Sequence, residues 1–211
     1  MISKLLNAIS DKYPLKEKGA SGFDGIKVKG MKFAINSYEA KGLGHVSTMC
    51  AKGFFGLMKM DTLIITPKYK DLPLFSYDRI KAMGNDKLYV EFYDTCVEEP
   101  NLNAIDDLLS KYSDIPKAEA KKQWYDDIKL SQTTTFVGKK KDSDSFDKMA
   151  LEFMNAFVCI DAKDVTDHET KEKKTSVYVD GLLNNGGPAT DVFLNAMGKE
   201  KTTELFKKVL F

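Results

Sequence analysis

The pattern of apolar and polar residues changes near the middle of the chain. In the first half, apolar side chains recur at every second position or form β-branched runs in six short segments, 23–29, 31–38, 45–52, 57–66, 72–83 and 88–94. Several of these segments are separated by short turns that contain glycine, such as Gly42-Leu43-Gly44 and Gly84-Asn85-Asp86. Period-two alternation is typical of half-buried strands, and such short turns join antiparallel neighbours. The first half therefore predicts one antiparallel meander.

The remaining segments have helical spacing. Apolar residues three and four positions apart predict amphipathic helices over 1–13, 102–112 and 145–159. Residues 171–184 and 189–210 predict two closing helices, the second broken at Gly198. A sheet with such apolar strands needs helices on its faces. The prediction is an α+β fold, an α/β/α sandwich with a central antiparallel sheet, formed by one domain over residues 1–211.

Composition narrows the class of protein. Of the 211 residues, 43% are hydrophobic and 30% are charged, which is ordinary for a soluble globular chain. No apolar run approaches the roughly 20 residues of a membrane helix, and the first residues lack a signal-peptide pattern. We therefore expect a cytoplasmic protein with no membrane partner. The net charge of +1 gives no general indication of nucleic-acid binding.

Cysteine and histidine content bears on metal and redox chemistry. The three cysteines lie far apart, each in an apolar setting, which suits free thiols in a reducing compartment. Only two histidines are present, too few for a multi-histidine metal centre. We therefore expect no metal site.

Common catalytic motifs such as the nucleophile elbow, the phosphate-binding loop and the zinc motif H-E-x-x-H are absent from the sequence. The glycine-rich segment 184–188 could hold an anion, but Pro188 starting a helix is the favoured interpretation. Asp94 ends the apolar strand 88–94, where partial burial would raise its pKa and allow acid catalysis. The alternative, favoured by local spacing alone, is that Asp94 caps the turn at Thr95-Cys96.

Several short motifs follow one another in a fixed order along nearly the whole chain: Asn36-Ser37-Tyr38, the strand ending at Pro67, Leu72-Pro73-Leu74-Phe75-x-x-Asp78, Asp94, Trp124, a strand at 133–137, a helix at 146–159 and the segment 193–211. This order resembles the ferredoxin-dependent bilin reductases and, more distantly, red chlorophyll catabolite reductase. The resemblance implies an α/β/α sandwich that holds an open-chain tetrapyrrole (a bilin) between the sheet and the C-terminal helices.

The resemblance also implies an enzyme that holds no bound metal or flavin and takes electrons from reduced ferredoxin. It implies that Asp94 is the proton donor. Gly187 occupies the position where the family often has a second acid, and Asp191, one helical turn further on, is the candidate replacement. The expected bilin-binding residues are Arg79, for the propionates, with Phe75, Tyr77, Tyr93, Gly187 and Phe193.

Other residues are weaker candidates. Phe54 and Phe55 are further aromatics that could line the cleft. Lysines could dock an acidic ferredoxin, in the groups Lys139-Lys140-Lys141, Lys117/Lys121/Lys122 and Lys171/Lys173/Lys174.

Two departures from the family pattern keep alternatives open. One is Gly187 in place of the second acid, and the other is the segment 66–68 where some members carry a glutamate. The alternatives are a non-catalytic tetrapyrrole-binding protein of the same fold and a reductase of another conjugated substrate.

Overall fold

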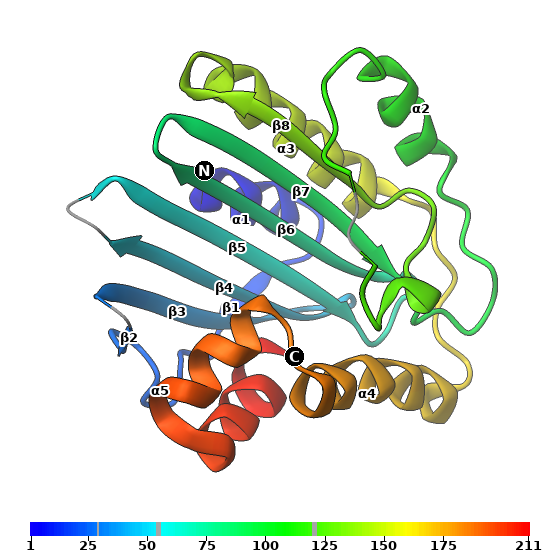
Figure 1. The fold of residues 1–211 in the computed structure, drawn as a ribbon. Coiled ribbons are helices and arrows are strands. Elements are labelled where there is room, and N and C mark those ends of the chain that lie inside the picture. The colour runs from blue at the N-terminus through cyan, green and yellow to red at the C-terminus, as the bar shows by residue number, and fades with distance from the viewer. Residues whose placement is uncertain (29, 54–55, 120–121) are drawn as a thin grey trace.

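In the computed structural model, which describes residues 1–28, 30–53, 56–119 and 122–211, the strands form a single antiparallel sheet (Figure 1). Its order is β1-β3-β4-β5-β6-β7-β8, with β2 paired to β3. The predicted meander is confirmed from β3 to β7, and β8 extends it. The strands are β1 Leu15–Glu17, β2 Lys27–Val28, β3 Met31–Ala40, β4 Gly44–Gly53, β5 Met58–Pro67, β6 Leu74–Ala82, β7 Asn85–Tyr93 and β8 Thr134–Lys139.

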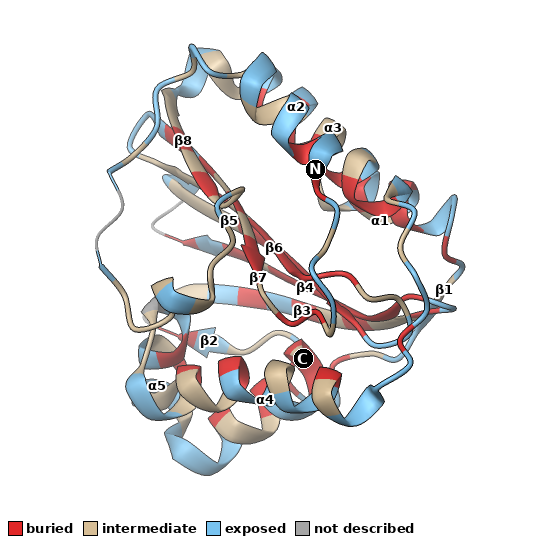
Figure 2. Ribbon diagram, turned by 90° about the vertical axis from the view of Figure 1, so that its right-hand side faces the viewer, coloured by how far each residue is buried: buried red, intermediate tan, exposed pale blue. Residues whose placement is uncertain are grey.

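Helices cover both faces of the sheet, which confirms the α+β sandwich (Figure 2). One face carries α1 (Ile2–Ser10), α2 (Asn103–Lys111) and α3 (Ser143–Cys159). The other carries α4 (His168–Asn185), α5 (Pro188–Leu205) and the closing π-helix η4 (Phe206–Leu210). Short 3-10 turns form η2 (Asp126–Ile128) and η3 (Lys140–Asp142). None of the helices in the described ranges has both the length and the apolar character needed to cross a bilayer.

The break predicted inside the last helical segment is present at Gly198. Its φ of 79° lies in the left-handed region that glycine tolerates, and it divides α5 into two pieces. The chain then turns back toward the sheet, so that η4 packs against β3 and β4.

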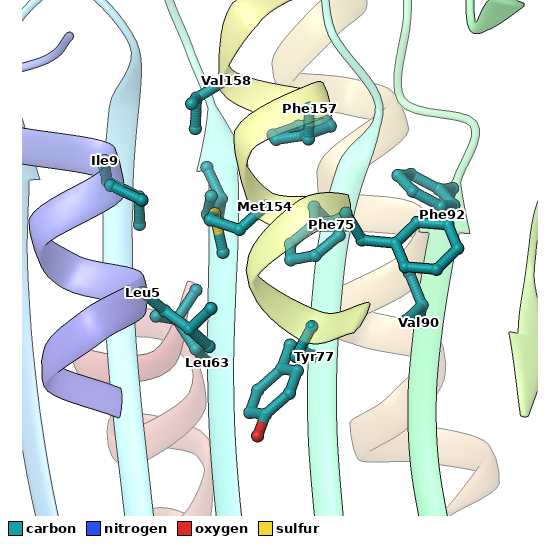
Figure 3. Packing of buried hydrophobic residues seen from close by; sticks show 14 of the residues in the cluster. Leu5, Ile9, Leu63, Phe75, Tyr77, Val90, Phe92, Met154, Phe157 and Val158 are labelled. Atoms are coloured by element: carbon teal, nitrogen blue, oxygen red, sulfur yellow. The ribbon is translucent and has the colours of Figure 1, made fainter. Parts of the chain in front are cut away.

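The face toward α1 and α3 holds the larger hydrophobic core. Figure 3 shows side chains of β5, β6 and β7 meeting those of α1 and α3. Phe75 of β6 stacks on Phe157 of α3 with ring centroids 4.9 Å apart, and Leu63 of β5 packs in the same cluster. This face is filled by the protein's own side chains, as is usual for a close-packed core.

The second core lies between the sheet and the C-terminal helices. Phe33 of β3 meets Phe193 of α5 edge-on, with centroids 5.2 Å apart. His45 Nε2 lies 2.8 Å from the carbonyl oxygen of Val209, and Ser47 Oγ donates to the carbonyl of Leu210 at 2.7 Å. Carbonyls at a helix end need partners, so these two β4 side chains fix η4 against the sheet.

Candidate functional site

Alternation along β6 separates two sets of side chains. Phe75 and Tyr77 belong to the core toward α1 and α3, whereas Leu74 belongs to the core toward α4 and α5. Because successive strand residues point to opposite faces, Ser76 and Asp78 share the face of Leu74. Asp78 is the last residue of the motif Leu72-Pro73-Leu74-Phe75-x-x-Asp78. It therefore lies on the face of the sheet that the C-terminal helices cover.

The carboxyl group of Asp78 is held by two hydroxyl groups. Thr62, directly opposite on β5, donates to Oδ1, and Ser76 Oγ donates to Oδ2 at 3.2 Å. The side chain is half-buried. Burial raises the pKa of Asp78 to about 6, although the two hydroxyl groups act to lower it, and the nearby Glu91 carboxyl adds to the rise. Asp78 therefore exchanges its proton close to neutral pH, as a general acid must.

A second carboxyl lies on the neighbouring strand. Glu91 of β7 is directly opposite Ser76, and it accepts a hydrogen bond from the hydroxyl of Tyr93 at 3.0 Å. Lys129 balances its charge with Nζ 3.2 Å from Oε1. Tyr89 is directly opposite Asp78, and burial together with the two carboxyl groups raises the pKa of its hydroxyl. The result is an acidic, tyrosine-lined patch across β5, β6 and β7.

Aromatic side chains border this patch on the side of α4. Tyr93 packs on Tyr178 of α4 in a tilted arrangement with centroids 4.2 Å apart, and Tyr125 approaches Tyr93 edge-on at 5.9 Å. Trp124 donates from Nε1 to the carbonyl of Gly186 at 2.9 Å. A β-carbon on Gly181 would lie 2.2 Å from the Trp124 ring, so only glycine lets Trp124 lie against α4.

The patch keeps partial access to solvent. On the same face of β3 and β4, Phe33, Ile35 and Met49 are buried under the C-terminal helices. Asp78 and Tyr89, further across the sheet, are only half-buried, as is Ile80. This part of the sheet face is therefore less completely covered than the part over β3 and β4.

A separate cavity of about 550 Å³ opens beside α4, with a wall that includes Thr66, Lys68, His168, Val179 and Phe211. Neither Asp78 nor Glu91 lines it. We place the candidate site at Asp78 because the carboxyl groups of Asp78 and Glu91 lie together on this face of the sheet. The cavity beside α4 is a different feature of the molecule.

Three of the predicted bilin-binding residues face away from the C-terminal helices. Phe75, Tyr77 and Arg79 are at most 2% exposed and face α1 and α3, away from α4 and α5. Arg79 pairs with Asp86, with Nη2 donating at 2.7 Å, and its guanidinium lies 4.9 Å from the Phe146 ring centroid. The prediction that they line the same cleft as Phe193 is therefore corrected: the pleat of β6 turns them into the opposite core.

Asp94 has the contacts of a turn cap. Its Oδ1 accepts a hydrogen bond from the amide of Cys96 at 3.1 Å, and Lys174 of α4 approaches Oδ2 at 3.2 Å. Its side chain is 42% exposed. These are the contacts expected from the turn-capping alternative, so a donor role for Asp94 stays a prediction.

The other predicted residues lie on or beside the C-terminal face. Tyr93 and Phe193 are buried there, at most 1% exposed. Gly187 caps α5, and Asp191 is exposed in the first turn of that helix, with Oδ1 close to Gly186. The structure therefore brings Asp191 to the loop that receives Trp124, and it gives no contact between Asp191 and Asp78.

Two of the lysines predicted to dock a ferredoxin make contacts within the fold. Lys171 is buried and donates to the carbonyl of Leu72 at 2.5 Å, while Lys174 is committed to Asp94 and Cys96. Phe54, Phe55 and Lys121 lie outside the described residues.

Sequence reasoning did not single out Asp78 and Glu91 as the carboxyl groups of this sheet face. The signal was present, because counting by two from the buried Leu74 places Ser76 and Asp78 on its face. What the count leaves open is which face the C-terminal helices cover.

The fold and the patch define an α/β/α sandwich with an acidic group on the sheet face below its C-terminal helices. Among solved structures, the chain is similar to phytochromobilin synthase from tomato in complex with biliverdin, with a TM-score of 0.77. Identity is 13%, over 98% of this chain and 80% of that chain. At this identity the likeness shows the fold alone. The comparisons found no matching family model and no matching curated protein.

Proposed function

We propose that this chain binds an open-chain tetrapyrrole against the α4/α5 face of β5, β6 and β7 and reduces it, with Asp78 supplying a proton. The observation that carries the proposal is the half-buried Asp78 carboxyl, whose pKa of about 6 keeps a proton available near neutral pH. The shared fold with a protein crystallised with biliverdin and the motif order of the bilin reductases support the same class of ligand.

The patch suits a flat conjugated ligand with acidic side groups. Tyr89, Tyr125 and Ile80 offer half-buried aromatic and aliphatic surface beside Asp78, on which a pigment ring can stack. Lys87 is directly opposite Ile80 and exposed, and it has no ion-pair partner within the described part of the chain. We assign to Lys87 the propionate contact expected of Arg79.

Reduction of one double bond adds two electrons and two protons. Reduced ferredoxin, the donor implied by the family resemblance, delivers the electrons one at a time, and each ferredoxin is oxidised once. Asp78 transfers its proton to the pigment, and the resulting carboxylate accepts hydrogen bonds from Thr62 and Ser76. Because the residue is only partly buried, water can reprotonate it for the second transfer.

The test combines binding and turnover. Biliverdin added to the protein should show a shifted visible absorption, and anaerobic incubation with a reduced ferredoxin system should then yield a reduced bilin. Asp78→Asn should keep the absorption shift and lose at least about 100-fold in turnover, the usual contribution of general acid catalysis. A wild-type protein that shifts the spectrum of no bilin, even at high concentration, would overturn the proposal.

Asp94→Asn separates the two candidate acids. The turn-cap contacts predict unchanged turnover in this variant, because its amide oxygen can still accept from Cys96. Loss of turnover with binding retained in Asp94→Asn, together with an active Asp78→Asn, would instead return the donor role to Asp94.

A non-catalytic binding protein is the second candidate, favoured by Gly187 at the position of the family's second acid and by the exposed position of Asp191. It predicts a bilin complex that the reduced ferredoxin system leaves unchanged. A reductase of another conjugated substrate predicts turnover with a different pigment and none with biliverdin. The same assay, run with biliverdin and with other conjugated pigments, therefore distinguishes all three.

A further inference from the structure

Five lysines form one row across five strands at the end of the sheet. The register pairs Lys27 with Lys32, Lys32 with Lys52, Lys52 with Lys59, and Lys59 with Lys81. Residues directly opposite each other in antiparallel strands point to the same face. We call these five residues the lysine row. Adjacent strands lie about 4.8 Å apart, so the row spans roughly 19 Å.

The lysine row opposes folding. Like charges directly opposite each other destabilise a strand pair, and four such pairs occur in succession. Only two of the amino groups have acidic neighbours, Lys59 with Asp61 at 2.9 Å and Lys81 with Asp86 at 3.8 Å, and Asp86 is already paired with Arg79. Lys27, Lys32 and Lys52 are exposed, and the ion pairs of the described residues do not include them. Such a concentration of unbalanced positive charge fits a partner that carries negative charge.

Two large apolar side chains lie immediately beyond the row. Leu57 precedes β5 and is 66% exposed, and Met83 follows β6 and is 87% exposed. The amide of Met83 donates to the carbonyl of Leu57 at 3.3 Å, so the two hairpin ends lie side by side. In Figure 1 these ends form the edge of the sheet farthest from α4. Among the described residues they are the two most exposed large hydrophobic side chains.

We propose that this end of the sheet binds the surface of an anionic lipid bilayer. Lysine amino groups would lie at the level of the headgroups, while Leu57 and Met83, at the tips, would enter the boundary of the acyl chains. Apolar tips backed by a line of positive charge fit a planar, fluid, negatively charged surface better than a rigid acidic protein, which would need a matching groove. The proposal departs from the expectation of no membrane partner, and it is independent of the Asp78 site.

The row is sufficient for reversible attachment. Each lysine near an anionic surface increases the partition about five-fold at moderate salt. Three lysines therefore correspond to roughly 100-fold, and the gain falls as salt is raised because the attraction is screened. Phosphatidylcholine alone, which has no net charge, should bind the protein weakly.

The experiment measures co-sedimentation of the full chain with vesicles. Vesicles of phosphatidylcholine mixed with phosphatidylserine should bind the protein, and pure phosphatidylcholine vesicles should bind it far less. The variant K27E/K32E/K52E should lose roughly 100-fold or more of the partition. It should also fold, because like charges still face each other at 27/32 and 32/52 as in the wild type, while the pair 52/59 gains opposite charges. Circular dichroism and thermal unfolding check this. The matched control K12E/K41E/K173E makes the same charge change at exposed lysines that lie before β1, in the β3–β4 turn at the opposite end of the sheet, and on α4, and it should keep binding.

A second variant, L57S/M83S, removes the apolar tips and should weaken binding several-fold while leaving its salt dependence in place. Three outcomes would overturn the proposal. The first is that the protein does not bind vesicles that contain phosphatidylserine. The second is that the two lysine variants lose the same amount of vesicle binding. The third is that the lysine row binds an acidic protein or RNA while the protein does not bind vesicles.

Discussion

Thr62 donates its hydroxyl hydrogen to the carboxyl of Asp78 across the β5–β6 pair. This bond stabilises the ionised carboxyl, so Thr62→Val should raise the pKa of Asp78 above its value of about 6. A hydrogen bond to a charged group contributes about 1.5–3 kcal/mol, which corresponds to one to two pH units. If Asp78 is the acid, the alkaline limb of kcat/KM for bilin reduction should move to higher pH by about that amount.

The control for this measurement is Thr48→Val. Thr48 is also buried, but it points to the opposite face of the sheet, toward α1 and α3. Its removal should leave the pH profile in place. If Thr62→Val is folded and the pH dependence of its kcat/KM does not change, Asp78 is not the acid in the proton-transfer step.

Asp78 should also lower the stability of the fold at neutral pH. Because burial raises its folded pKa from 3.8 to about 6, the folded state holds more protons than the unfolded state between these values. The free energy of unfolding should therefore fall as pH rises through this window, by up to about 3 kcal/mol. Asp78→Asn should raise the melting temperature by several degrees at pH 8 and by little at pH 4. An equal effect at both pH values would contradict this linkage.

The sequence predicted the sheet well because its signals are local. The alternation of apolar and polar residues from Met31 to Tyr93, together with the short glycine turns, determines which strands pair. In the same way, Gly198 is a local signal that the last helical segment is interrupted. The division of β6 into two faces was equally local, but which face the C-terminal helices cover depends on where residues 168–211 pack, and these begin 86 positions after the end of β6. Asp94 illustrates a different limit, since one spacing fits both a turn cap and an exposed acid, and only contacts with Cys96 and Lys174 distinguish them.

The buried pair of Arg79 and Asp86 should serve the fold and leave ligand binding unaffected. Burial raises the pKa of Asp86, but hydrogen bonds from Arg79 and Ser143 outweigh it and hold the pKa below its usual range. Arg79→Met would leave this carboxylate buried and unpaired, at a cost of about 3–5 kcal/mol in unfolding free energy. The double variant R79M/D86L should recover much of that loss. Urea unfolding measures both.

Biliverdin affinity provides the second readout for Arg79. In Arg79→Met, assayed where the protein is still folded, the dissociation constant should stay within two-fold of wild type, whereas Lys87→Met should weaken binding. A large loss of affinity in Arg79→Met and none in Lys87→Met would restore the propionate role first expected of Arg79.

His45 should make stability depend on pH in the opposite direction to Asp78. Burial lowers its pKa from 6.5, and as the neutral ring it donates from Nε2 to the carbonyl of Val209. As pH falls below about 6.5, the unfolded chain takes up a proton that the folded chain does not, so this contribution to stability is lost. His45→Gln keeps an N–H donor and cannot titrate. The difference in unfolding free energy between His45→Gln and wild type should grow in favour of the variant from pH 7.5 to 5.5, and a constant difference would contradict the assignment.

Trp124 should report ligand binding, because it is the single tryptophan of the chain and borders the Asp78 patch through Tyr125. Biliverdin bound on this face should quench its fluorescence.

Gly181→Ala places a β-carbon where the indole ring of Trp124 lies, so the ring must leave α4 and give up its bond to Gly186. The emission of this variant should shift to longer wavelength, and biliverdin should bind more weakly. Val177→Ala is the matched control on α4, since this side chain is 55% exposed. Unchanged emission and affinity in Gly181→Ala would show that Trp124 does not form a wall of the binding site.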